Sequence, residues 1–142
     1  RYGDYSKAGE FVYDHPFQFG SKRTGPDLHR VGGKYPNLWH YNHMKDPRST
    51  TSDSIMPPYT WLLEDDLDLG LTRDKVDAMR KLGVPYDDAR VAGAVAEAQQ
   101  QAKVIGDDLA ANGVEGVQDK EIVALIAYLQ RLGRDTTAPA AK

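Results

Sequence analysis

The sequence predicts a mainly α-helical fold with long ordered loops, and three observations support this fold class. Six of the eight prolines lie in residues 1–61, so any helices there must be short. All four histidines lie in the same part of the chain. From residue 62 onward helix breakers are rare, and apolar residues recur at spacings of three and four, the period of an amphipathic helix. No segment alternates apolar and polar residues over the length of a strand.

The clearest predicted helix lies in the segment DKEIVALIAYLQRLG, residues 119–133. Asp119 is placed to cap its amino end, and Gly133 is placed to end it in the left-handed conformation. The apolar residues of this segment form one stripe that we expect to face the core: Ile122, Leu125, Ile126, Leu129 and Leu132.

Two more helices form a predicted helical insertion before the C-terminal helix. The first runs from Arg73 to Leu82, with Thr72 as its cap and Gly83 after its end. Val76 and Met79 are its expected inward-facing residues.

The second helix of the insertion begins at Asp87–Asp88 and ends at Asn112–Gly113. Gly93 and Gly106 lower the helical propensity within it. Its expected buried stripe consists of small and aliphatic residues: Val91, Val95, Ala98, Ala102, Ile105 and Leu109.

In the first half the sequence predicts one short helix, Asn37–Met44, between Pro36 and Pro47. Gly32–Gly33 indicates a turn or a close approach of two backbones. We expect residues 1–134 to form one domain and residues 135–142, DTTAPAAK, to be a disordered tail. Long ordered loops in so small a domain usually surround a functional site.

Composition excludes several classes of protein. The chain of 142 residues carries a formal net charge of −3 and no basic stripe, which argues against a dedicated nucleic-acid-binding protein. It contains no cysteine, so it forms no disulfide and no thiolate metal site. No apolar run approaches the roughly 20 residues of a membrane span. Catalytic motifs of the GxSxG, GxxxxGK and HExxH types are missing, so we expect no substrate chemistry from this chain alone.

Met56 is the first candidate for chemistry. In SIMPPYTWL it precedes Pro57 and Pro58, which push its backbone toward an extended geometry and stiffen the chain after it. A thioether held in this way suits a soft ligand for iron or copper. The alternative is that Met56 fills a gap in the core, as most methionines do.

The turn Thr24–Gly25–Pro26 is the second candidate. Proline has no amide hydrogen, and the carbonyl of such a turn is free to accept a hydrogen bond from outside. A metal-bound imidazole needs an acceptor of this kind for its other ring nitrogen. The alternative is an ordinary tight turn.

The histidines and tryptophans leave further alternatives open. His40 and His43 would share a helix face, and His29 could join them in a zinc site, although no carboxylate has a matching spacing. Trp39 and Trp61 could pack against a planar cofactor or belong to the core. We expect the remaining histidine, His15, to be structural.

In their order along the chain, several segments resemble the downstream part of a class I cytochrome c: TGPDL, HMKDPRS, the Met-Pro pair and ALIAYLQ. Longer stretches are similar to the monohaem cytochrome c subunit (subunit II) of the cbb3-type haem-copper oxidases: YGDYSKAGEFVYDHPFQFGSKRTGPDLHRVGGKY, SIMPPYTWL, LGVPY and ALIAYLQRLG. The resemblance covers residues 1–135 and implies a class I cytochrome c-like fold, with the helical insertion before the C-terminal helix.

The resemblance implies a site that holds haem c. Met56 would be the distal iron ligand, and the Pro26 carbonyl would accept a hydrogen bond from the proximal histidine, with Thr24 in the same turn. The aromatic residues expected at the haem are Tyr59, Trp61 and Trp39. The expected propionate partners are Arg23 and Arg48.

The resemblance also implies a function in electron relay. Such a subunit takes electrons from a dihaem cytochrome c subunit and passes them to haem b of the catalytic haem-copper oxidase subunit. Oxygen is reduced to water there, and the reduction is coupled to proton pumping. The family places this domain on the periplasmic side of the bacterial inner membrane, behind an amino-terminal transmembrane anchor. We expect residues 62–118 to provide a docking elaboration or an extension of the core.

The sequence departs from the family pattern in one respect. The family's CxxCH motif and membrane anchor precede the stretch that begins at Arg1, and no histidine present here lies in a CxxCH context. We therefore expect the chain to be a piece of a longer protein. Two other hypotheses remain: a cofactor-free helical interaction module, and the small zinc-binding domain described above.

Overall fold

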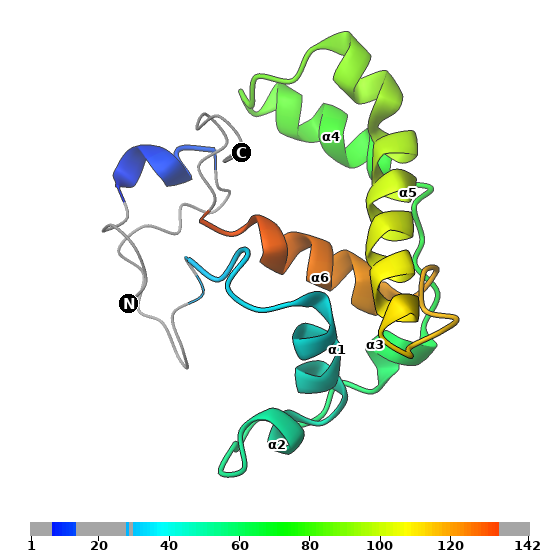
Figure 1. Ribbon diagram of the computed structural model, residues 1–142. Coiled ribbons are helices and arrows are strands. Elements are labelled where there is room, and N and C mark those ends of the chain that lie inside the picture. Colours follow the sequence, from blue (N-terminus) through cyan, green and yellow to red (C-terminus); the bar gives the residue numbers. More distant parts are fainter. Residues whose placement is uncertain (1–6, 14–27, 29, 134–142) are drawn as a thin grey trace, which may run out of the picture.

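The computed structural model describes residues 7–13, 28 and 30–133 of the chain. These residues form helices joined by loops, as Figure 1 shows: η1 (Ala8–Phe11), α1 (Asn37–Lys45), α2 (Pro47–Thr50), α3 (Trp61–Glu64), α4 (Thr72–Lys81), α5 (Asp88–Ala111) and α6 (Glu121–Arg131). Pairing of extended chain within the described part is limited to an isolated antiparallel bridge between Asp66 and Lys120. The predicted mainly α class is confirmed.

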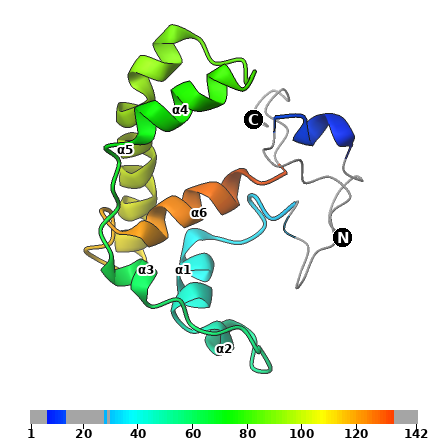
Figure 2. The ribbon, with the colours of Figure 1, turned by 180° about the vertical axis from the view of Figure 1, so that it is seen from behind.

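The core lies where α6 crosses the C-terminal half of α5 (Figures 1 and 2). α1 and α3 both pack against α6, so four helices meet around one apolar cluster. The buried members of this cluster are Tyr41, Ala102, Ile105, Leu109, Val117, Ile122, Val123 and Ile126. This cluster fixes α1, whose Met44 carbonyl oxygen accepts the Tyr59 N–H at the end of the loop that carries Met56.

The predicted stripes are confirmed in the main and corrected in detail. On α6, Val123 is fully buried, whereas the predicted Leu125 is only half-buried. On α5, Ala94 is buried, whereas the predicted Val95 and Ala98 are half-buried. The difference arises because α5 faces α4 near its amino end and α6 near its carboxyl end, so its buried face is not a single straight stripe.

Two of the predicted helix caps are wrong. The cap position of α6 is Lys120, one residue after Asp119, and no side chain caps the helix there. The backbone carbonyl of Asp119 accepts the Leu67 N–H at 2.7 Å. Thr72 is the first residue of α4 and not its cap. The predicted start of α5 is confirmed, since the Asp87 side chain accepts the Arg90 N–H at 2.7 Å.

α5 continues through both of its glycines, and Gly106 has a packing reason. A Cβ at Gly106 would lie 2.6 Å from the Cβ of Gln118, so only glycine lets the turn before α6 approach the helix this closely. A Cβ at Gly93 would meet nothing within 4 Å. Gly106 therefore serves the crossing of α5 and α6, and Gly93 does not.

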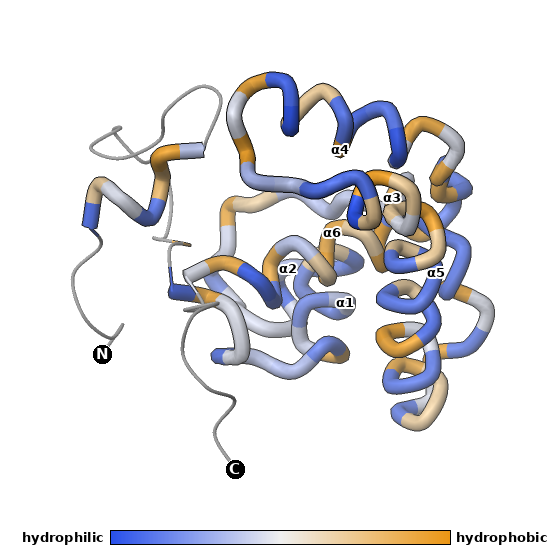
Figure 3. Tube along the Cα trace, turned by 90° about the horizontal axis from the view of Figure 1, so that it is seen from above, coloured by the Kyte–Doolittle hydropathy of each residue, from blue (hydrophilic) through white to orange (hydrophobic). Residues whose placement is uncertain are grey.

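α4 and the amino-terminal half of α5 form a hairpin that extends away from α1 and α2 (Figures 1 and 2). This hairpin has a small apolar interior of its own, formed by Val84, Val91 and Ala94. In Figure 3, α4 changes repeatedly between hydrophilic and hydrophobic residues along its length, as expected for a surface helix, and its predicted inward-facing residues Val76 and Met79 are half-buried.

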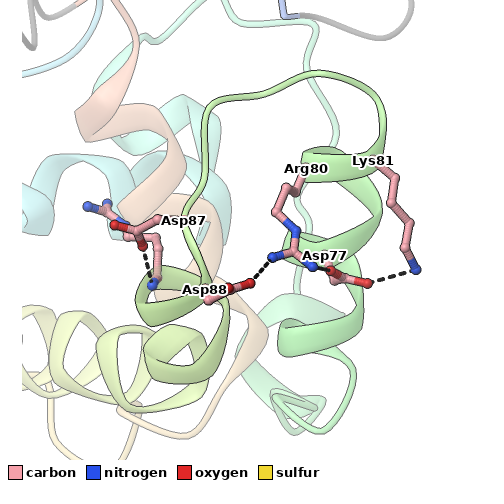
Figure 4. A network of polar contacts seen from close by, with 6 residues as sticks. Asp77, Arg80, Lys81, Asp87 and Asp88 are labelled. Carbon is pink, nitrogen blue, oxygen red and sulfur yellow. Dashed lines mark hydrogen bonds and ion pairs between the residues drawn. The ribbon is translucent and has the colours of Figure 1, made fainter.

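Charged side chains join the two helices of the hairpin (Figure 4). Arg80 on α4 forms ion pairs with Asp77, at 2.5 Å, and with Asp88 at the start of α5. Lys81 adds a second cation to Asp77 at 2.8 Å. Arg80 thus links the last turn of α4 to the first turn of α5.

Within the described residues, no helix is both long enough and apolar enough to cross a membrane. Residues 135–142, which we expect to be a disordered tail, lie outside the described residues.

Candidate functional site

Met56 is half-buried and lies in the loop between α2 and α3, residues 51–60, which we call the methionine loop. Its backbone N–H donates to the Ser54 hydroxyl oxygen at 3.2 Å. After Pro57 and Pro58, which have no amide hydrogen, the Tyr59 N–H donates to the carbonyl oxygen of Met44 in α1 at 2.8 Å. The methionine is therefore held by a hydrogen bond on each side.

The start of this loop is fixed by α2. Pro47 at its first turn is fully buried, and the Asp46 side chain accepts the Arg48 N–H at 3.1 Å. Arg48 then donates from Nε to the Ser54 carbonyl oxygen at 3.3 Å. Arg48, predicted as a propionate partner, is exposed, and its Nε contacts the methionine loop itself.

Tyr59 and Trp61 lie next to each other just after Met56. Their rings meet edge to face with centroids 5.0 Å apart. Trp61 is 49% exposed, and Ile55 on the other side of Met56 is 99% exposed. The side chains next to Met56 in the sequence are therefore apolar and largely exposed, while Tyr59 is half-buried.

Trp39 belongs to an aromatic stack along one side of α1. Tyr35 and Trp39 stack with ring centroids 4.0 Å apart, and Trp39 and His43 stack at 4.6 Å. Nδ1 of His43 lies 2.6 Å from the hydroxyl oxygen of Thr50 in α2. The stack thus connects the chain before α1 to the helix that starts the methionine loop. Sequence reasoning missed it, although the spacing of four between its members was a usable signal.

His40, on the same helix, is buried in the core. Its side chain is 1% exposed, and its Nε2 has no hydrogen-bond partner in the described structure. Burial, and secondarily the nearby His43, holds the pKa of His40 below its ordinary value. His40 is therefore a neutral imidazole in the core, with its edge against Tyr35 and Trp39.

Of the predicted site residues, the structure brings together Met56, Tyr59, Trp61 and Arg48, all in or beside one loop. Trp39 lies on α1, which the Tyr59–Met44 hydrogen bond joins to that loop. The remaining predicted site residues and histidines fall outside the described residues: Arg23, Thr24, Pro26, His15 and His29.

The described part of the chain holds no group of three His, Asp or Glu side chains suited to a metal ion. His43 is engaged in its stack and with Thr50, and His40 is enclosed in the core. These two histidines give no support to the predicted zinc site.

Two cavities of about 260 and 360 Å³ lie between α4, α5 and α6. They share four lining residues, Thr72, Ala98, Gln101 and Arg131, and neither is lined by a residue of the methionine loop. They belong to the insertion and do not contribute to the site around Met56.

A small helical domain that holds a half-buried methionine in a stiff loop beside exposed aromatic side chains offers a soft donor to a metal-containing cofactor. The family model described as cytochrome c oxidase, mono-heme subunit/FixO matches residues 1–136, and the chain belongs to this family. It is thus a monohaem cytochrome c subunit of the cbb3-type oxidase, an oxidoreductase complex, and its role is in electron transfer. No curated protein matches the chain.

The described residues fit the distal side of a haem. Met56 offers a soft sulfur donor in a loop fixed from both ends, and the open apolar surface beside it suits a large planar group. The thioether bonds of a c-type haem cannot come from these 142 residues, because they include no cysteine.

Proposed function

We propose that this chain relays single electrons through a His/Met-ligated haem c, with Met56 as the distal iron ligand. Haem c, when bound, supplies the one-electron couple. The observation that carries the proposal is the restraint of Met56. Its own N–H donates to the Ser54 hydroxyl, and three residues later the Tyr59 N–H donates to the Met44 carbonyl oxygen. A ligand held in this way stays in place when the iron changes charge, so little reorganisation accompanies electron transfer.

The side chains around Met56 have a second task, which is to exclude water. Tyr59, Trp61 and Trp39 provide aromatic surface near the loop. Aromatic walls lower the local polarity, which favours the reduced, less charged state of the iron and raises the reduction potential.

On the proximal side, Pro26 is the proposed acceptor for the ring N–H of the proximal histidine, with Thr24 in the same turn. Arg23 and Arg48 are the proposed partners of the haem propionates. For Arg48, the terminal guanidinium nitrogens are the groups left for this task, because Nε donates to Ser54. The histidine and the cysteines that bind the haem are proposed to lie outside these 142 residues.

The proposed route of electrons runs from a dihaem cytochrome c subunit to this chain and on to haem b of the catalytic subunit, where oxygen is reduced to water with proton translocation. The family membership supports this route. The proposed location is the periplasmic side of the bacterial inner membrane, with an amino-terminal anchor outside these residues.

Substitution of Met56 tests the proposal in the haem-loaded full-length subunit. Met–iron ligation gives the oxidised protein a weak absorption band near the red end of the spectrum, and Met56→Ala should abolish it. Met56→His should also lower the reduction potential, because two nitrogen ligands favour the oxidised iron more than His/Met ligation does.

Met79→Leu on α4 is the matched control, since Met79 is half-buried and remote from the loop. It should keep both the band and the potential. An unchanged band in Met56→Ala would show that Met56 is not the ligand.

A further inference from the structure

We propose that Ser54, held in turn by Arg48, is the positioning residue that determines where the Met56 thioether lies. This inference rests on the proposed function, in which Met56 is the distal ligand. It concerns the strength of the Met–iron interaction and not its existence.

The contacts of Ser54 make it the link between the loop and the ligand. Its hydroxyl oxygen accepts the Met56 N–H at 3.2 Å, and its own N–H donates to the Thr51 carbonyl oxygen at 3.0 Å. Its carbonyl oxygen accepts Nε of Arg48 at 3.3 Å. The backbone N–H, the backbone carbonyl and the side chain of Ser54 are therefore all engaged.

The hydrogen bond to Ser54 matters because packing does little to hold this stretch. Ile55 is 99% exposed, so no burial of its side chain fixes the residue before the ligand. Pro57 and Pro58 are both exposed and have no amide hydrogen. The next backbone hydrogen bond along the chain is that of Tyr59, three residues after Met56.

Arg48 links the Ser54 turn to α2, which is anchored in the core. It sits in α2, where the neighbouring Pro47 is fully buried and Asp46 binds the Arg48 N–H. From there Nε reaches the Ser54 carbonyl oxygen. A residue expected to act on the haem by charge thus also acts on the ligand loop by position.

The test measures how easily an external ligand displaces the methionine. Imidazole is titrated into the oxidised, haem-loaded full-length subunit, and its binding is followed through the loss of the red-end band. Removal of the hydroxyl in Ser54→Ala should tighten imidazole binding roughly three- to tenfold, the range expected for the loss of one hydrogen bond on the competing ligand.

Two variants control this measurement, and a third tests the role of Arg48. Ser52→Ala removes an exposed hydroxyl from the same loop, and Ser54→Thr keeps a hydroxyl at the critical position; both should bind imidazole as the parent does. Arg48→Lys keeps the charge for a propionate but removes the Nε–H, so it should also tighten imidazole binding.

The outcomes separate this inference from the function beneath it. If Met56→Ala loses the band while Ser54→Ala binds imidazole no more tightly than Ser52→Ala, Ser54 has no positioning role. Should Ser54→Ala fail to fold, Arg48→Lys decides, and parental imidazole binding in that variant overturns the proposal. A band that survives Met56→Ala instead overturns the assignment of the ligand.

Discussion

Gly32 donates its backbone N–H to the carbonyl oxygen of Leu132 at 2.9 Å, which joins the loop before α1 to the end of α6. A Cβ at Gly32 would lie 2.6 Å from that oxygen, so this hydrogen bond requires glycine. Gln130 strengthens the junction: its side-chain oxygen accepts the Gly33 N–H, and its side-chain nitrogen donates to the Tyr35 carbonyl, each at 2.9 Å. The Gly32–Gly33 pair is thus the close backbone approach that the sequence indicated.

Gly32→Ala should destabilise the protein by about 1–3 kcal/mol, because the new methyl group cannot fit without moving two backbones apart. Chemical denaturation monitored by circular dichroism measures this change. Gly9→Ala is the control, since a Cβ at Gly9 meets no atom of the described residues within 4 Å. Equal stability of the two variants would contradict the close approach.

The two glycines of α5 should respond in opposite directions to the same substitution. Gly93→Ala should stabilise the protein by about 0.5–1 kcal/mol, because alanine favours a helix and the site is open. Gly106→Ala should destabilise it by about 1–3 kcal/mol, because its methyl group would meet Gln118. Thermal unfolding of both variants measures the difference, and the same sign for both would contradict the packing of α5 on the turn before α6.

His40 should make the protein less stable in mild acid. Its folded-state pKa lies below the ordinary value of 6.5, so the unfolded chain takes up a proton more readily than the folded one. The stabilisation is present above pH 6.5 and is lost as the pH falls from there through the lowered folded pKa. His43 contributes in the same direction, because burial lowers its pKa as well.

Replacement of His40 by leucine should remove the His40 part of this pH dependence and leave the part due to His43. An apolar residue also removes the buried nitrogen that has no partner, so the stability at pH 8 should change little. Urea denaturation between pH 5 and 8 measures both effects. A pH dependence as steep as that of the parent would show that His40 does not titrate as a buried imidazole.

The ionised Asp77 side chain should stabilise the α4–α5 hairpin, and this stabilisation should be lost in acid. Lys81, and next to it Arg80, lowers the pKa of Asp77 below its ordinary value of 3.8 in the folded state. The contribution is therefore present above pH 3.8 and is lost as the pH falls through the folded pKa. It is small and sensitive to salt, because the network is open to solvent.

Asp77→Asn measures this contribution through hydrogen exchange of the hairpin amides at pH 6. Faster exchange than in the parent is expected at low salt, and the difference should shrink at 1 M salt. Asp74→Asn is the control on the same helix, at an exposed position. A salt-independent difference would show that the Asp77 side chain acts through something other than charge.

The sequence predicted the four longer helices, α1, α4, α5 and α6, because their signals are local, and it did not predict the short helices η1, α2 and α3. The apolar spacing of α6, the acidic start of α5 and the prolines around α1 each act within a few residues, and each predicted the correct helix. The caps predicted at Asp119 and Thr72 were each one residue away from the observed cap positions, Lys120 and Leu71. At α6 the entry of the chain involves a distant contact that local signals do not show, because the Leu67 N–H, about 50 residues away, donates to the Asp119 carbonyl oxygen.

The candidate site shows the same division. The amino acid sequence by itself determined that Met56 lies in a stiff, proline-flanked loop, because proline restricts its neighbours whatever the fold around it. Only the tertiary structure decided how that loop is held. The restraints come from Arg48 in α2 and from Met44 in α1, and the buried cluster around α6 fixes α1. The tertiary structure also decided that His40 is buried while His43 stacks on Trp39. The two histidines are three residues apart on one helix, so their environments depend on what packs against each of them.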